Sequence, residues 1–89
     1  MGVIKTITKE RFEHEMNRAK TFQKLEPDRA DYWVGYMRGL RRAYHGENFG
    51  TPEEHASWMG AKDNYGDDPV RRARGEGYRD GLKGQAKEA

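Results

Sequence analysis

Apolar residues recur every three or four positions along most of this chain, a spacing that predicts helices rather than strands. The apolar positions of the first such segment are Phe12, Met16, Ala19, Phe22 and Leu25, and the side chains expected to face solvent between them are Glu13, Glu15, Arg18, Lys20 and Lys24. Thr8 stands where its hydroxyl can accept a hydrogen bond from a first-turn N–H group, and Pro27 stops the helix that precedes it. We therefore predict a helix over residues 9–25, after a short arm at residues 1–7.

A second amphipathic segment begins at Pro27 and ends at Gly46. Its apolar stripe consists of Trp33, Met37, Leu40 and Tyr44. Gly35 and Gly39 interrupt the helix at a cost of about 1 kcal/mol each relative to alanine, and they share one face because they are four residues apart. A glycine pair on one face allows a second backbone to approach closely, so we expect this face to pack against another helix.

The skeleton of this segment occurs again 42 positions later in the chain. PDRADYWVGYMRGL at residues 27–40 and PVRRARGEGYRDGL at residues 69–82 both begin with proline and end with GYxxGL. The second copy has a thin apolar face and would hardly be helical alone, so we predict that it packs on the first. The residues expected to take part in helix packing are Gly35, Gly39, Gly77, Gly81, Trp33, Tyr36 and Tyr78. The two repeat units would span residues 26–46 and 68–84.

A shorter helix is predicted over residues 52–60, because Thr51-Pro52 combines a capping hydroxyl with a proline at the first helical position. Residues 85–89 are expected to fray. Together these segments predict a single all-α domain, residues 1–89, built as a small bundle of three to four short helices.

The composition narrows the function as well as the fold. Apolar residues make up 34% of the 89 residues and aromatic residues 11%, which indicates a small, aromatic-rich core that a second copy or a partner could complete. Because the chain contains no cysteine, it cannot form disulfides or thiolate metal sites, which fits a reducing cytoplasm. No apolar run approaches the roughly 20 residues that a membrane span needs. We therefore expect a cytoplasmic protein without a membrane partner.

The sequence shows no pattern typical of a catalytic or metal site. Ser57, the only serine, lies in a predicted helix rather than in a strained turn. His14, His45 and His55 stand on separate segments without the spacing of metal ligands, so we expect ordinary surface histidines. We predict no catalytic residues, no metal and no cofactor, and hence no enzyme.

Arginine and tyrosine side chains gather at the end of the second predicted helix and at the start of the last. The residues that we expect to bind a partner are Arg38, Arg41, Arg42, Tyr44, Arg71, Arg72, Arg74 and Arg79. Basic side chains interleaved with aromatic ones suit phosphate contact and base stacking. However, 15 acidic residues stand against 17 lysines and arginines, whereas strong nucleic-acid binders usually carry a large positive excess. This balance favours charges that face solvent or a protein.

The GYxxG segments resemble those of ribosome modulation factor, a short bacterial ribosome-binding protein of two helices. Residues 77–84, GYRDGLKG, are similar to the first helix of that family, and residues 33–38, WVGYMR, to its tryptophan-glycine second helix, in the reverse order. Residues 1–25 and 51–60 have no counterpart in it. In style, this short, cysteine-free chain rich in arginine and glycine also resembles prophage-encoded proteins that bind and block host machines, including restriction and CRISPR complexes.

These observations predict a non-catalytic binding protein. The function that we favour is a small modulator or inhibitor, of the phage anti-defence (anti-CRISPR-like) kind, that docks on a larger protein or ribonucleoprotein complex. One alternative is a ribosome-associated factor that binds RNA or DNA directly, as the resemblance implies. Another is a structural protein that forms a homodimer through its glycine faces.

Overall fold

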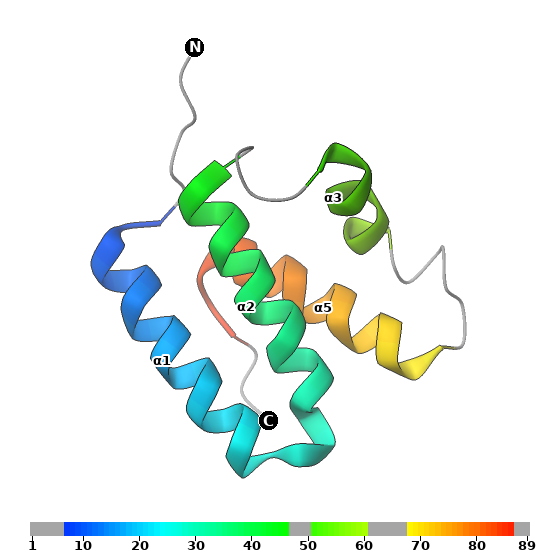
Figure 1. Ribbon diagram of the computed structural model, residues 1–89, viewed down its shortest axis with the longest axis horizontal. Coiled ribbons are helices and arrows are strands. Elements are labelled where there is room, and N and C mark those ends of the chain that lie inside the picture. Colours follow the sequence, from blue (N-terminus) through cyan, green and yellow to red (C-terminus); the bar gives the residue numbers. More distant parts are fainter. Residues whose placement is uncertain (1–6, 47–50, 61–67, 87–89) are drawn as a thin grey trace.

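The computed structural model describes residues 7–46, 51–60 and 68–86, and every regular element within them is helical, which confirms the predicted all-α fold there (Figure 1). The elements are α1 (Lys9–Leu25), the 3₁₀ turn η1 (Pro27–Arg29), α2 (Ala30–His45), α3 (Pro52–Met59) and α5 (Pro69–Lys83). α2 lies at the centre, with α1 along one side, α5 crossing behind it and α3 beside α5 (Figure 1).

Three helices begin where a side chain satisfies first-turn N–H groups that have no partner inside the helix. At the start of α1, the Thr8 hydroxyl accepts a hydrogen bond from the Arg11 N–H at 3.1 Å. At the start of α3, the Thr51 hydroxyl accepts one from the Glu54 N–H at 3.0 Å. The Asp68 carboxylate caps α5 by accepting from two N–H groups of its first turn. These caps place the helix starts where the sequence predicted them.

Two local expectations differ from the structure. Pro27–Arg29 forms a separate 3₁₀ turn, so α2 begins at Ala30, and no side-chain cap fixes either start. Leu25 was expected on the apolar face of α1, but it is 69% exposed. It lies three residues beyond Phe22, the last α1 side chain that packs on the core.

Both ends of the described chain are tied to the core. Ile7 is buried against Gly84, the residue that caps the end of α5. The Gln85 N–H donates to the Asp80 carbonyl oxygen at 3.3 Å, and Ala86 packs on the core cluster. Fraying was expected from residue 85 onward, and these contacts hold residues 85 and 86. The remainder of that tail and residues 1–6 lie outside the described residues.

α2 and α5 cross with their backbones in direct contact. A Cβ atom added to Gly35 would lie well inside the 3.0 Å that real Cβ atoms keep, against the carbonyl oxygen of Arg74. One added to Gly39 would meet the carbonyl oxygen of Tyr78 in the same way. Because the contacts advance together along both helices, α2 and α5 run in the same direction. Only glycine allows two helices to approach this closely.

The glycines of α5 make the same contacts in return. A Cβ atom added to Gly77 would meet the carbonyl oxygen of Tyr32, and one added to Gly81 would meet that of Tyr36. These are the α2 contacts shifted by 42 residues with the helices exchanged, as in an interface between identical subunits related by a twofold axis. The chain is therefore pseudo-twofold, with α1–α2 as one unit and α3–α5 as the other.

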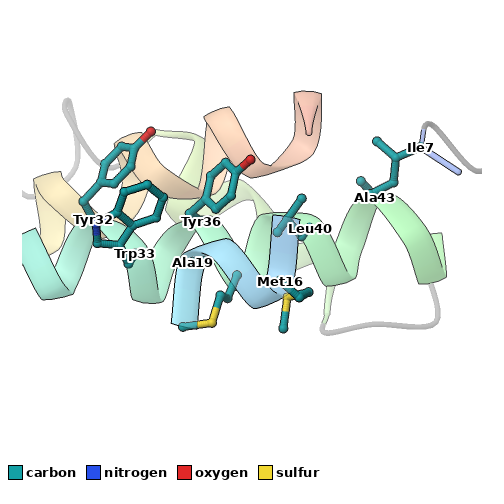
Figure 2. Close-up of a cluster of buried hydrophobic side chains, with 9 residues drawn as sticks. Ile7, Met16, Ala19, Tyr32, Trp33, Tyr36, Leu40 and Ala43 are labelled. Atoms are coloured by element: carbon teal, nitrogen blue, oxygen red, sulfur yellow. The ribbon is translucent and has the colours of Figure 1, made fainter. Parts of the chain in front are cut away.

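The main core lies between α1 and α2, and Figure 2 shows its buried side chains. They are Ile7, Met16, Ala19, Tyr32, Trp33, Tyr36, Met37, Leu40 and Ala43. Stacked rings lie at both ends of this contact: Phe22 stacks on Trp33 with ring centroids 5.2 Å apart. Phe12 stacks on Tyr44 with centroids 4.5 Å apart. Because each large ring removes roughly 150–250 Å² from water, the two stacks hold α1 along the length of α2.

The cover of α5 is much thinner than that of α2. α3 has eight residues, none of them buried, whereas α1 has 17 residues. The positions of α5 equivalent to Trp33 and Met37 are Gly75 and Arg79. A glycine and an arginine offer far less apolar surface to cover than a tryptophan and a methionine, so one short helix suffices.

We expect Gly39→Ala and Gly81→Ala each to destabilise the protein by at least about 1 kcal/mol. The added methyl must push two backbones apart, so the cost should lie at or above the upper end of the usual overpacking range of about 1–3 kcal/mol, and it exceeds the gain of about 1 kcal/mol in helix propensity. The double variant should lose less than the sum of the two, because the first methyl already separates the helices. Urea denaturation of the four proteins measures these free energies of unfolding. A stabilised single variant, or full additivity, would show that the backbones do not touch at this point.

Candidate functional site

Three buried tyrosines carry polar contacts between the helices. The Tyr36 hydroxyl donates to Glu15 of α1 at 2.5 Å. Glu15 is only 1% exposed and also accepts from Arg18 at 3.1 Å. The Tyr32 hydroxyl donates to buried Asp80 of α5 at 2.6 Å. Because a buried carboxylate without a partner is costly, these contacts restrict which helix faces can meet.

The third tyrosine, Tyr78, pairs with His55 of α3. Its hydroxyl lies 2.6 Å from His55 Nδ1, and the two rings meet edge to face with centroids 5.5 Å apart. Tyr36 and Tyr78 hold the same place in the GYxxGL repeat, and each reaches a side chain of the preceding helix, 21 and 23 residues earlier. The pseudo-twofold relation therefore extends from the glycines to the polar contacts, with Glu15 in one unit and His55 in the other.

Burial shifts the pKa values of these groups. It raises the pKa of the Tyr36 hydroxyl, and the hydrogen bond to Glu15 raises that pKa further. Burial also raises the pKa of Tyr78, although two nearby arginines of α2 oppose the shift. It lowers the pKa of His55, and the charge of Arg42 lowers that pKa further. At neutral pH the tyrosine hydroxyls are therefore protonated and His55 is neutral.

The arginines predicted to bind a partner fall into two groups, of which the first is held by acidic side chains of the protein. The ion pairs are Arg38–Glu54, Arg74–Asp31 and Arg71–Asp68. The pair of Arg38 joins α2 to α3, and the pair of Arg74 joins α5 to α2 at 3.1 Å. These pairs are partly exposed, so each contributes about 1 kcal/mol or less.

The second group has no acidic partner shown among the described residues. Arg41, Arg72 and Arg79 make no hydrogen bond or ion pair within the part of the chain that the structure describes. Arg72 is exposed, and the other two are half-buried. Arg42 is also half-buried, and it lies close enough to His55 to lower the pKa of that ring.

The aromatic residues of α2 lie inside the molecule. Trp33 is buried, and its indole N–H donates to Glu26 at 3.0 Å. Tyr44, which we expected to anchor a partner, stacks on Phe12 with the ring planes 11° apart. One face of the Tyr44 ring is therefore covered by α1, and the residue is half-buried.

Sequence reasoning missed the polar residues of the interior. Glu15 was assigned to the solvent face, yet it follows Phe12 by three residues and so shares the apolar face, a signal that was available. Asp80 carried no such signal, because it stands among glycines and charged residues in the thin second repeat. His55 was expected at the surface, and the correction comes from its bond to Tyr78, which only the packing of α3 on α5 reveals.

The described ranges contain no group of three or more His, Cys, Asp or Glu side chains that could hold a metal ion. No helix in them is long and apolar enough to cross a membrane. In comparisons with known proteins, the chain matches no protein family, no curated protein and no solved structure. The site is thus defined by its own geometry: an interior in which tyrosines bond to acids and a histidine, and outward-facing arginines.

Removing one member of the Tyr36–Glu15 pair should lower the free energy of unfolding by more than the net contribution of the pair, because the other member stays buried without its partner. Tyr36→Phe deprives a buried carboxylate of a donor, and Glu15→Met leaves a buried hydroxyl without its acceptor. Each should lower the free energy of unfolding by about 1–3 kcal/mol. The double variant joins two apolar groups, so it should lose less than the sum when the proteins are compared by urea denaturation.

The matched control for this cycle is Glu13→Met, which removes an exposed carboxylate of the same helix. Among the described residues, Glu13 is paired only with Lys9, at 3.9 Å, so its loss should change the free energy of unfolding by about 0.5 kcal/mol or less. Equal effects of Glu13→Met and Glu15→Met would contradict the role assigned to the buried pair.

Proposed function

We propose that this protein is a non-catalytic binding module that docks on an acidic surface of a larger protein or ribonucleoprotein complex in the cytoplasm, as a modulator or inhibitor of the anti-defence kind. The docking surface is the outer face of α5, formed by Arg72, Arg79 and Lys83, which we call the α5 basic face. The observation that carries the proposal is that these three cations have no ion pair among the described residues, whereas other arginines do.

The helical register gathers these cations on one side. Arg72, Arg79 and Lys83 are separated by seven and four residues, so they lie along one stripe of α5, which also carries one acidic residue, Glu76. Gly77 and Gly81 occupy the opposite side, where α5 meets α2. The stripe therefore lies on the side of α5 away from α2, where Arg72 and Lys83 are exposed and Arg79 is half-buried, and its cationic groups can bind carboxylates of a partner.

The position of the aromatic rings favours a protein partner over direct nucleic-acid binding. Base stacking needs exposed ring faces, but Tyr32, Tyr36 and Tyr78 are buried and bonded inside the molecule. Phosphate contacts alone would have to supply the affinity, and the net charge of the chain is only +2.

The glycine faces also argue against self-association as the main function. The homodimer alternative required the faces of Gly35 and Gly39 to meet those of another copy. Within this chain they meet the backbone of α5, and the glycines of α5 meet α2 in return. Both faces are therefore satisfied inside one molecule.

Charge reversal on the α5 basic face should abolish partner binding without unfolding the protein. We expect Arg72→Glu/Arg79→Glu to weaken a complex recovered from a bacterial lysate by about tenfold or more, because two favourable charge contacts become repulsive. The control is Lys20→Glu/Lys24→Glu, which makes the same charge change on exposed positions of α1. The wild type and the control should recover the same stoichiometric complex, identified by mass spectrometry.

The same variants distinguish the nucleic-acid alternative. Fluorescence anisotropy with single-stranded RNA and duplex DNA should show weak binding that the α5 variant and the α1 control alter alike. Tight binding that falls steeply between about 50 and 200 mM salt, and that the α5 variant alone removes, would replace the protein partner by a nucleic acid. Equal recovery of the complex by both double variants would exclude the α5 basic face.

A further inference from the structure

α3 is the least firmly held helix of the described chain. It has eight residues and none of them is buried, so it lacks the apolar anchoring that α1 has in Met16 and Ala19. An isolated helix of this length is not stable in water. In Figure 1 it lies on the outer side of α5, away from the contact between α1 and α2. Its position therefore depends on half-buried side chains, among them His55 and Trp58, and on the polar contacts that α3 makes.

His55 and Glu54 make polar contacts that join α3 to the other helices. His55 Nδ1 lies 2.6 Å from the Tyr78 hydroxyl of α5, with the rings edge to face. One residue earlier, Glu54 forms an ion pair with Arg38 of α2. His55 thus stands where α2, α3 and α5 meet, and it is the one member of these contacts whose ordinary pKa is near neutral.

We propose that His55 makes α3 an acid-released latch, which detaches from α5 on protonation while α1, α2 and α5 stay packed and which thereby uncovers Tyr78. The device concerns the outer cover of α5, and it does not depend on which partner binds the α5 basic face.

The charges around His55 disfavour its protonated form. Arg42 and Arg38 of α2 lie near the contact between His55 and Tyr78, and Arg42 lowers the pKa of the imidazole in addition to the effect of burial. Glu54 is the acid next to His55 in α3, and its carboxylate is already paired with Arg38. A protonated His55 would therefore lie near two cations of α2, while the carboxylate next to it in sequence, that of Glu54, is already paired with Arg38.

The charged groups of α5 do not change this balance. Arg71, two turns before Tyr78 on the same side of α5, is paired with Asp68 at 3.4 Å. Arg74 is paired with Asp31 of α2 at 3.1 Å. On α5, the group that contacts the imidazole is the Tyr78 hydroxyl, whose raised pKa keeps it protonated and neutral.

The direction of the effect follows from the lowered pKa. A histidine whose pKa is lower in the closed state binds a proton more readily once α3 is released. The closed state is fully favoured above the ordinary histidine pKa of about 6.5, and its advantage shrinks as the pH falls from there to the lowered pKa. Each unit of lowering corresponds to about a tenfold change in the ratio of closed to open molecules.

Amide hydrogen exchange of the full-length protein tests the proposal. After correction for the intrinsic pH dependence of exchange, the amides of residues 52–59 should lose protection between about pH 7.5 and pH 5. The amides of α1, α2 and α5 should keep theirs. Unchanged protection of α3, or equal loosening of all four helices, would overturn the proposal.

Two variants separate the latch from a general effect of acid. His55→Asn keeps a polar group near the Tyr78 hydroxyl but cannot titrate, so α3 should keep the same protection at both pH values. His14→Asn, on the exposed face of α1, should lose α3 protection as the wild type does. If His55→Asn does not fold, Arg42→Gln takes its place, and removing that cation should reduce the effect of acid. An acid response of the variant equal to that of the wild type would overturn the role of His55.

Discussion

The fold depends on one interaction, the direct contact of two helix backbones at their crossing. Gly35 and Gly39 of α2 rest against carbonyl oxygens of α5, and Gly77 and Gly81 rest against carbonyl oxygens of α2. No larger residue fits at any of the four positions without a shift of backbone. Because the two sets of contacts are related by the same 42-residue offset, the crossing is one self-complementary interface made within a single chain. α1 and α3 then occupy equivalent places outside it.

The tyrosine of each GYxxGL repeat links this crossing to the outer helices. It follows the first glycine directly, so it lies beside the crossing and its hydroxyl reaches the helix that precedes it. Tyr36 meets a buried glutamate and Tyr78 meets a histidine. The two units therefore share geometry but differ in chemistry: one contact is reinforced by the apolar core of α1, and the other joins a helix with no buried residue. Of the two similar units, one therefore has an outer helix with buried residues and the other an outer helix without any.

The sequence contained most of the fold, because its signals are local. Caps and prolines place the helix starts, and glycines four residues apart identify a helix face that another backbone can approach. The partners of buried polar groups could not be predicted from local signals, since they depend on how the helices cross. The ion pair of Arg74 with Asp31 spans 43 residues and the bond of Tyr32 with Asp80 spans 48, and neither has a local pattern. Leu25 shows the converse error. The apolar periodicity of α1 continues to Leu25, but the last apolar side chain of α1 that packs on the core is Phe22, about one turn earlier.

The net charge of +2 conceals an uneven distribution of charge. Acidic side chains such as Glu15, Asp31 and Asp80 are drawn into the helix contacts, where tyrosines and arginines hold them. These acidic groups are therefore bonded inside the helix contacts. On the outer side of α5, Arg72 and Arg79 have no ion pair within the described residues. A chain that looks nearly neutral by composition therefore carries, on the outer side of one helix, cations that no described acid pairs with, so its total charge is a poor guide to its local electrostatic field.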